Sequence, residues 1–161
     1  ASVGEDVTTG AGNIMIGQGS ESSSATTSEA IAIGVGATAE DGGLSMGRAS
    51  TAVQDSIAIG RGTTATGIDS VVIGEGATSG TSSTVLGQGA QSASGGTALG
   101  QGANAASNGI ALGKGAASTA SAIAIGSSGT PITLSSGQSG GSTTLPVLIN
   151  GTQYYIQIHV P

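Results

Sequence analysis

The stretch that decides the fold is SIAIGRGTTATG, residues 56–67, in which an apolar–small–apolar triplet precedes a glycine. A run of Ala, Thr and Ser follows the glycine, and the whole unit recurs about nine times. Successive copies are 13 or 14 residues apart, apart from one gap of 17, and a fixed period of this kind indicates stacked repeats. The glycines that mark the copies are Gly17, Gly34, Gly47, Gly60, Gly74, Gly87, Gly100, Gly113 and Gly126.

Within each copy, the alternation of residue types is that of β-strands. Counted from the marking glycine, positions −3 and −1 are mostly Ile or Leu, and residues two apart on a strand share a face. Positions +3 and +5 are small. We therefore predict that the Ile and Leu side chains point inward and meet the small residues across a thin interior. A helix is disfavoured by the recurring glycine and by the density of β-branched residues.

The length of the repeat fits one turn of a roll. Thirteen residues span at most about 45 Å when extended, which allows two short strands and two tight turns. Equivalent strands then stack in parallel about 4.8 Å apart, so nine coils extend over roughly 40 Å. The predicted fold class is all-β: a parallel β-roll, or solenoid, of about nine coils of 13–14 residues.

Position −2 is predicted to face outward, and it is small and mostly apolar in most copies. A narrow roll buries little apolar area by itself, so a small-residue stripe favours close packing against another copy of the chain. Crowding at a turn is the alternative explanation of the small side chains. The predicted interface residues are Ala32, Ala58, Val72, Val85, Ala98, Ala111 and Ala124.

Position +1 carries every Lys and Arg of the chain, namely Arg48, Arg61 and Lys114, and is predicted to be a solvated edge. Arg48 and Arg61 stack beside Glu75, where we expect an ion pair worth less than about 1 kcal/mol. An outward threonine column at position +4, residues 38, 51, 64 and 78, suggests an ice-binding face. The column is interrupted from Gln91 onward, so this function is not favoured.

Composition excludes several classes of function. The 161 residues include 31 glycines but no Phe, Trp or Cys, so a conventional globular core is not expected. Low-complexity disorder is the alternative, and the apolar pairs at fixed intervals argue against it.

The net charge is −6, and three cations cannot form a phosphate-binding stripe, so we expect no nucleic-acid partner. No apolar run is long enough to cross a membrane.

Catalytic chemistry is not predicted. The chain has one His, no Cys and no clustered acid–base pair. Asp55 and Asp69 lie one coil apart, but a calcium site needs more ligands than this stack offers. We therefore predict neither an enzyme nor a cofactor or metal.

The residues after the repeats differ from them. A Ser/Gly-rich connector, residues 128–144, precedes LPVLINGTQYYIQIHVP, residues 145–161, in which Asn150-Gly151 between two β-rich runs predicts a hairpin. The predicted organisation is thus a lead-in arm (1–12), the roll (13–127), the connector and the hairpin. A lone hairpin is marginal in water, so we predict that this tail docks on another sheet or protein. The predicted docking residues are Leu145, Val147, Ile149, Tyr154, Tyr155, Ile156, Ile158 and Val160.

The unit SxAIGxGAxA, repeated every 13–14 residues from Asn13 to about Ser127, resembles the head repeat of trimeric autotransporter adhesins, the YadA-like head. The resemblance implies a left-handed parallel β-roll, three chains per trimer, and adhesion to host matrix or cell surfaces without catalysis. The chain departs from that family after Ser127, because it shows no coiled-coil heptads and no set of membrane-barrel strands.

The tail pattern LPVxINGTxYYI is instead similar to the tails of small phage virion proteins. Together with the acidic N-terminal segment, in which no signal peptide is visible, it favours a phage structural protein. We therefore predict a homotrimeric capsid cement or decoration protein on the virion surface, docked on the major capsid protein or another virion protein. The alternatives are the head of a bacterial cell-surface adhesin and a short phage tail fibre.

Overall fold

The structure of the chain is a computed structural model, and it describes residues 12–22, 28–126, 143–149 and 152–158. The chain divides into two units, Ala1–Pro131 and Ile132–Pro161. All the described regular elements are β-strands.

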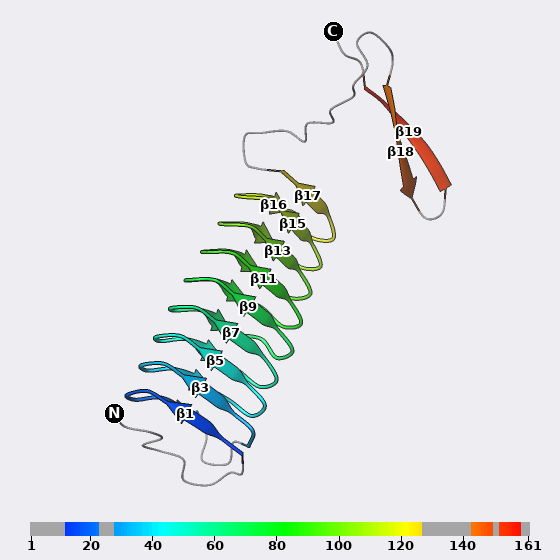
Figure 1. Cartoon of the computed structure of the whole chain (residues 1–161). Coiled ribbons are helices and arrows are strands. Elements are labelled where there is room, and N and C mark those ends of the chain that lie inside the picture. The colour runs from blue at the N-terminus through cyan, green and yellow to red at the C-terminus, as the bar shows by residue number, and fades with distance from the viewer. Residues whose placement is uncertain (1–11, 23–27, 127–142, 150–151, 159–161) are drawn as a thin grey trace. The chain divides into compact units, whose positions relative to one another are not determined.

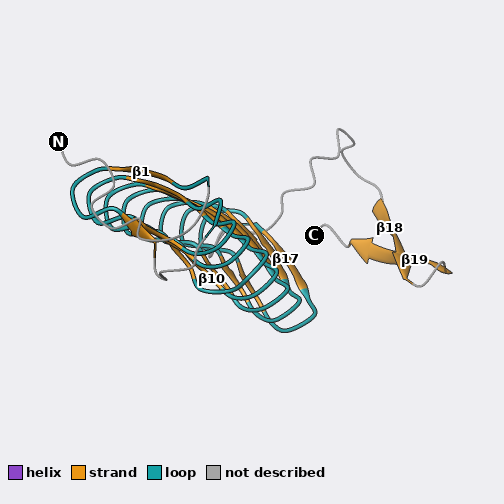
Figure 2. Cartoon of the chain, turned by 90° about the horizontal axis from the view of Figure 1, so that it is seen from below, coloured by secondary structure: helices purple, strands orange, loops and turns teal. Residues whose placement is uncertain are grey.

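The first unit is a stack of coils, each contributing a three-residue strand followed, in all but the last coil, by a two-residue strand (Figures 1 and 2). The three-residue strands form one parallel sheet of nine, in chain order, and the two-residue strands form a second parallel sheet of eight. The predicted all-β parallel solenoid is confirmed. The nine-stranded sheet contains β1 (Ile14–Ile16), β3 (Ile31–Ile33), β5 (Leu44–Met46), β7 (Ile57–Ile59), β9 (Val71–Ile73), β11 (Thr84–Leu86), β13 (Thr97–Leu99), β15 (Ile110–Leu112) and β17 (Ile123–Ile125). The eight-stranded sheet contains β2 (Glu21–Ser22), β4 (Thr38–Ala39), β6 (Thr51–Ala52), β8 (Thr64–Ala65), β10 (Thr78–Ser79), β12 (Gln91–Ser92), β14 (Asn104–Ala105) and β16 (Ala117–Ser118).

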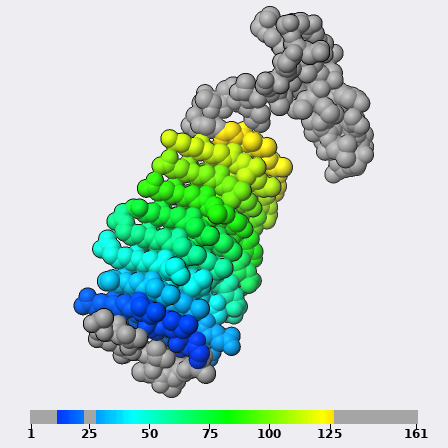
Figure 3. All heavy atoms as spheres, viewed as in Figure 1, coloured from blue at the N-terminus to red at the C-terminus, as the bar shows by residue number. Residues whose placement is uncertain are grey.

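Neighbouring coils pair in register, so each residue stands over the equivalent residue of the next copy. Ile57, for example, pairs with Leu44 on one side and with Val71 on the other. The longer repeats do not disturb this pairing, because the extra residues fall between strands: between Ser22 and Ser28 in the 17-residue gap, and near Gly67 in the 14-residue one. Each band of colour in Figure 3 accordingly follows directly on the one before it.

The marking glycine is required at the tight turn after each three-residue strand. At Gly74 the backbone has φ +146°, and a Cβ there would lie 2.3 Å from the carbonyl oxygen of Gly87 in the next coil. Since that carbonyl oxygen belongs to the backbone, it cannot move aside easily, and only glycine allows the coils to approach this closely.

The interior of the roll is built from small side chains. Positions +3 and +5 point inward, as predicted: Ala37, Ala39 and Ala52 are fully buried. The facing strand, however, contributes position −2 to the interior, and not positions −3 and −1. The prediction that the Ile and Leu columns fill the core is therefore wrong. A 13-residue coil encloses too little space for two large side chains, and the largest fully buried ones are Val72 and Val85.

Most buried hydroxyls in the interior are paired, and Ser118 Oγ is a buried hydroxyl without a partner among the described residues. Ser45 and Ser50 face each other across one coil, with their Oγ atoms 2.7 Å apart. Ser56 and Ser70 each donate to a carbonyl oxygen three residues earlier in the chain, at 2.6 and 2.7 Å. Hydrogen bonding of this kind offsets the cost of placing polar atoms in a thin core.

The second unit contains an antiparallel hairpin, β18 (Thr143–Ile149) and β19 (Thr152–Ile158). Ile149 pairs with Thr152, which leaves two residues for the connection, so the predicted hairpin is confirmed. Its first strand begins two residues ahead of the boundary predicted from the sequence. The turn residues 150–151, Val160, residues 1–11 of the lead-in arm and residues 128–142 of the connector lie outside the described residues.

Candidate oligomer interface

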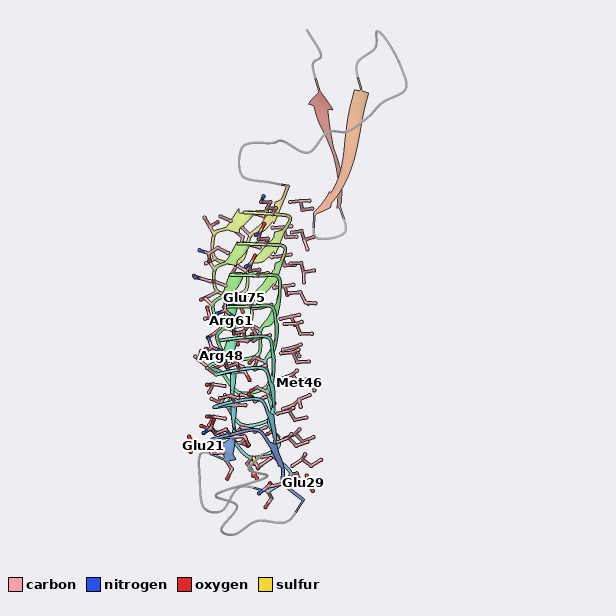
Figure 4. All side chains as sticks on the ribbon, turned by 60° about the vertical axis from the view of Figure 1, so that its left-hand side comes forward. Glu21, Glu29, Met46, Arg48, Arg61 and Glu75 are labelled. Carbon is pink, nitrogen blue, oxygen red and sulfur yellow. The ribbon has the colours of Figure 1, made fainter. Side chains whose placement is uncertain are left out.

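The outer face of the nine-stranded sheet carries a column of mostly large side chains along all nine strands, here called the aliphatic ladder. It consists of the first and last residues of each strand, and sixteen of these eighteen positions are Ile, Leu, Val or Met. Ile16 is 49% exposed, Leu86 39% and Ile123 67%. In Figure 4 these side chains project from one side of the stack, with Met46 among them. The ladder members are Ile14, Ile16, Ile31, Ile33, Leu44, Met46, Ile57, Ile59, Val71, Ile73, Thr84, Leu86, Thr97, Leu99, Ile110, Leu112, Ile123 and Ile125.

The residues predicted to form the oligomer interface lie inside the roll instead. They occupy the middle of each three-residue strand, and all but the last are completely buried within one chain, so they cannot contact another copy. Ala124, in the last coil, is half-buried. The residues wrongly predicted to form the interface are Ala32, Ala58, Val72, Val85, Ala98, Ala111 and Ala124.

The small residues of these strands were predicted to face outward because of the strands' composition. Both alternating sets of residues in these strands are apolar, so alternation alone does not tell which set is inside. The prediction followed the rule that the larger apolar side chains are buried. The clue to the buried face is the side-chain volume at position −2. This position is Ala in five of nine copies and Ser in one, and a narrow interior requires small side chains of this kind.

The opposite side of the stack is polar. The threonine column lies on the outer face of the eight-stranded sheet, where Thr51 and Thr64 pair in register and are half-buried. Position +1 lies at an exposed edge, as predicted, and Figure 4 shows Arg48, Arg61 and Glu75 on the side away from Met46. The roll therefore presents one aliphatic face and one hydrophilic face.

Side chains on the polar edge make contacts between neighbouring coils. Arg61 Nη2 pairs with Glu75 Oε1, which confirms the ion pair expected there. Further along, the side-chain amide of Gln101 donates to Gln88 Oε1 at 3.0 Å. Both pairs are exposed, so each contributes little to stability.

The described residues contain no group of three or more His, Cys, Asp or Glu side chains that could hold a metal ion. No described helix is long and apolar enough to span a membrane. Within the described part of the chain, the aliphatic ladder is therefore the feature that most needs a functional explanation.

For the hairpin, the structure describes the pairing of the two strands but not the environment of their side chains. The register places Leu145 opposite Ile156 and Val147 opposite Tyr154. The docking role predicted for residues 145–160 stays a prediction.

Comparison with known proteins agrees with the repeat pattern. No family model matches the chain, and no curated protein matches it. Among solved structures, the chain is similar to the collagen-binding domain of the Yersinia adhesin YadA, with a TM-score of 0.56 and 21% sequence identity over 83% of this chain and 78% of that chain. At this identity the likeness shows the fold alone, and it agrees with the parallel β-roll that the repeat pattern predicts.

Proposed function

We propose that the chain is the head of a homotrimeric bacterial surface adhesin, a non-enzymatic rod that binds ligands along its hydrophilic faces. The observation that carries the proposal is the aliphatic ladder. It runs through all nine coils of the roll, and the chain that bears it resembles an adhesin domain in fold.

A ladder of this length needs a partner. Soluble monomers rarely leave contiguous apolar patches larger than a few hundred Å² in water. Full burial of one such side chain stabilises by about 1.5–3 kcal/mol, and the ladder repeats that gain in every coil. Further copies of the chain offer a partner that matches it coil for coil, since a closed rotational symmetry brings equivalent surfaces together. Three copies is the number that the resemblance of the repeat implies.

Burial of the ladder leaves the hydrophilic faces outward. These faces combine the threonine column with the exposed edge at position +1. The solved neighbour is a collagen-binding domain, so an extracellular-matrix protein is the class of ligand that we propose. Binding would then be spread over a rigid surface, without a deep pocket or a catalytic group.

The comparison supports the adhesin alternative better than the capsid decoration protein that the tail pattern favoured. The virion location and a capsid partner stay predictions of the sequence. A capsid decoration protein would use the same trimeric rod as a structural spacer. The adhesin and the decoration protein therefore differ in what they bind and not in how the chains assemble.

Two measurements on the full chain test the proposal. Sedimentation equilibrium should give three times the chain mass of 14.9 kDa. Immobilised collagen should then retain the trimer, and albumin should not. A monomer at micromolar concentration would overturn the homotrimer. A trimer that binds neither matrix proteins nor host-cell surfaces would overturn the adhesin.

A further inference from the structure

The aliphatic ladder is broken at one place. Two neighbouring strands begin with threonine: Thr84 in β11 and Thr97 in β13. They pair with each other in register, with Val71 on one side and Ile110 on the other. Both threonines are half-buried, and neither hydroxyl forms a hydrogen bond with the described residues. The break is thus two adjacent polar rungs within a face that is otherwise aliphatic.

A uniform aliphatic ladder would make copies of the chain associate, but it would not determine how the copies are aligned along the stack. Successive coils are nearly identical, so a copy displaced by one coil, about 5 Å, still brings eight of nine rungs into aliphatic contact. An antiparallel arrangement also covers aliphatic residues with aliphatic residues. Something besides burial must select one arrangement, and a single polar position does this in coiled coils.

We infer that Thr84 and Thr97 fix the axial alignment and the parallel orientation of the copies. This inference rests on the proposed homotrimer. In a parallel, aligned assembly, closed symmetry brings each threonine rung to the same rung of the other copies. The hydroxyls can then donate to and accept from one another or share a water molecule.

A displaced or antiparallel arrangement leaves threonine hydroxyls without a hydroxyl partner. After a displacement by one coil, Thr84 of one copy meets Thr97 of the next, so one threonine contact is kept. The remaining Thr97 then meets Ile110, and the remaining Thr84 meets Val71. An antiparallel arrangement brings Thr84 to Ile57 and Thr97 to Leu44, because the two threonines lie on one side of the central strand β9. In each case hydroxyls are buried against aliphatic side chains without a partner, which is unfavourable.

The test uses the full chain, which contains no cysteine, with a spin label on Gln18→Cys at an exposed turn of the first coil. The variant of interest is Thr84→Val/Thr97→Val, which removes both hydroxyls and keeps the branched shape. Thr84→Ser/Thr97→Ser restores hydroxyls, and Thr64→Val/Thr78→Val is the matched control on the opposite sheet. Sedimentation gives the mass, and electron–electron resonance gives the distances between labels.

The parent protein, the serine variant and the control should each give one mass and one label–label distance. The valine variant should still associate but show a second distance, longer by up to about 38 Å for antiparallel copies, as expected for eight coil steps. It should also form larger species, since displaced copies do not close a ring. A valine variant with the parent's single mass and single distance would overturn the inference and leave the homotrimer standing. A monomeric parent would overturn both.

Discussion

Ile57 and Ala58 are consecutive residues of β7, and they end on opposite sides of the wall of the roll. Ala58 is completely buried in the interior, while Ile57 remains half-exposed on the aliphatic ladder. The same inversion of size, with the small residue inside and the large one outside, recurs in most of the nine strands. It makes the large residues available for contacts between chains.

The interior should not tolerate a larger residue. Ala58→Leu adds three carbons to a site that is completely buried, and overpacking of this kind costs about 1–3 kcal/mol or more. Thermal unfolding followed by circular dichroism should show a lower midpoint. Ile57→Leu, one residue away on the outer face, is the control and should change the midpoint little. Equal effects at both positions would contradict the assignment of inside and outside.

A charge on the aliphatic ladder should separate the chains. Ile73→Asp places a carboxylate where the proposed trimer buries an apolar side chain, and an unpaired buried charge costs several kcal/mol. We expect the dissociation constant to rise by at least about 100-fold, measured by sedimentation equilibrium. Gln91→Asp adds the same charge on the exposed outer face of β12 and should leave the mass unchanged. An intact trimer in the Ile73 variant would argue against the ladder as the interface.

The marking glycine should be far more sensitive than the glycine two residues later. In Gly74→Ala the new Cβ meets the carbonyl oxygen of Gly87, and we expect a loss of about 3 kcal/mol or more in unfolding free energy. Around Gly76, no atom lies within 4 Å of the added Cβ, so Gly76→Ala should cost only about 1–2 kcal/mol, from its φ of +64°. Ala49 already occupies the equivalent position of another coil, with φ +55°. A similar loss in both variants would show that steric contact between coils is not the deciding factor.

The exposed ion pair should contribute little. Because Arg61 and Glu75 are 59% and 46% exposed, Arg61→Ala should lower the free energy of unfolding by less than about 1 kcal/mol. Chemical denaturation with urea at low ionic strength and at about 1 M salt should show the difference shrinking as salt screens the charges. Lys114→Ala removes a cation that forms no ion pair with the described residues, and it should show no comparable salt-dependent difference. A loss for Arg61→Ala that persisted at high salt would point to packing of the arginine side chain instead.

The sequence by itself determined the period, the strands, their parallel stacking and the hairpin. Each of these depends on local or periodic information: the glycine every 13 or 14 residues, the alternation around it and the Asn150-Gly151 turn. The repeated unit also resembles that of YadA-like heads, and the structural likeness to such a domain agrees with the roll which that resemblance implies.

Only the tertiary structure decided which side of the long strands faces inward. Alternation was ambiguous there, since Ile57 and Ile59 are apolar and Ala58 between them is apolar too. The choice depends on the space enclosed when two sheets are joined by short turns, and that space holds Ala, Ser and Val but not two rows of Ile. Closing a narrow coil thus places the small residues inside and the aliphatic ladder outside.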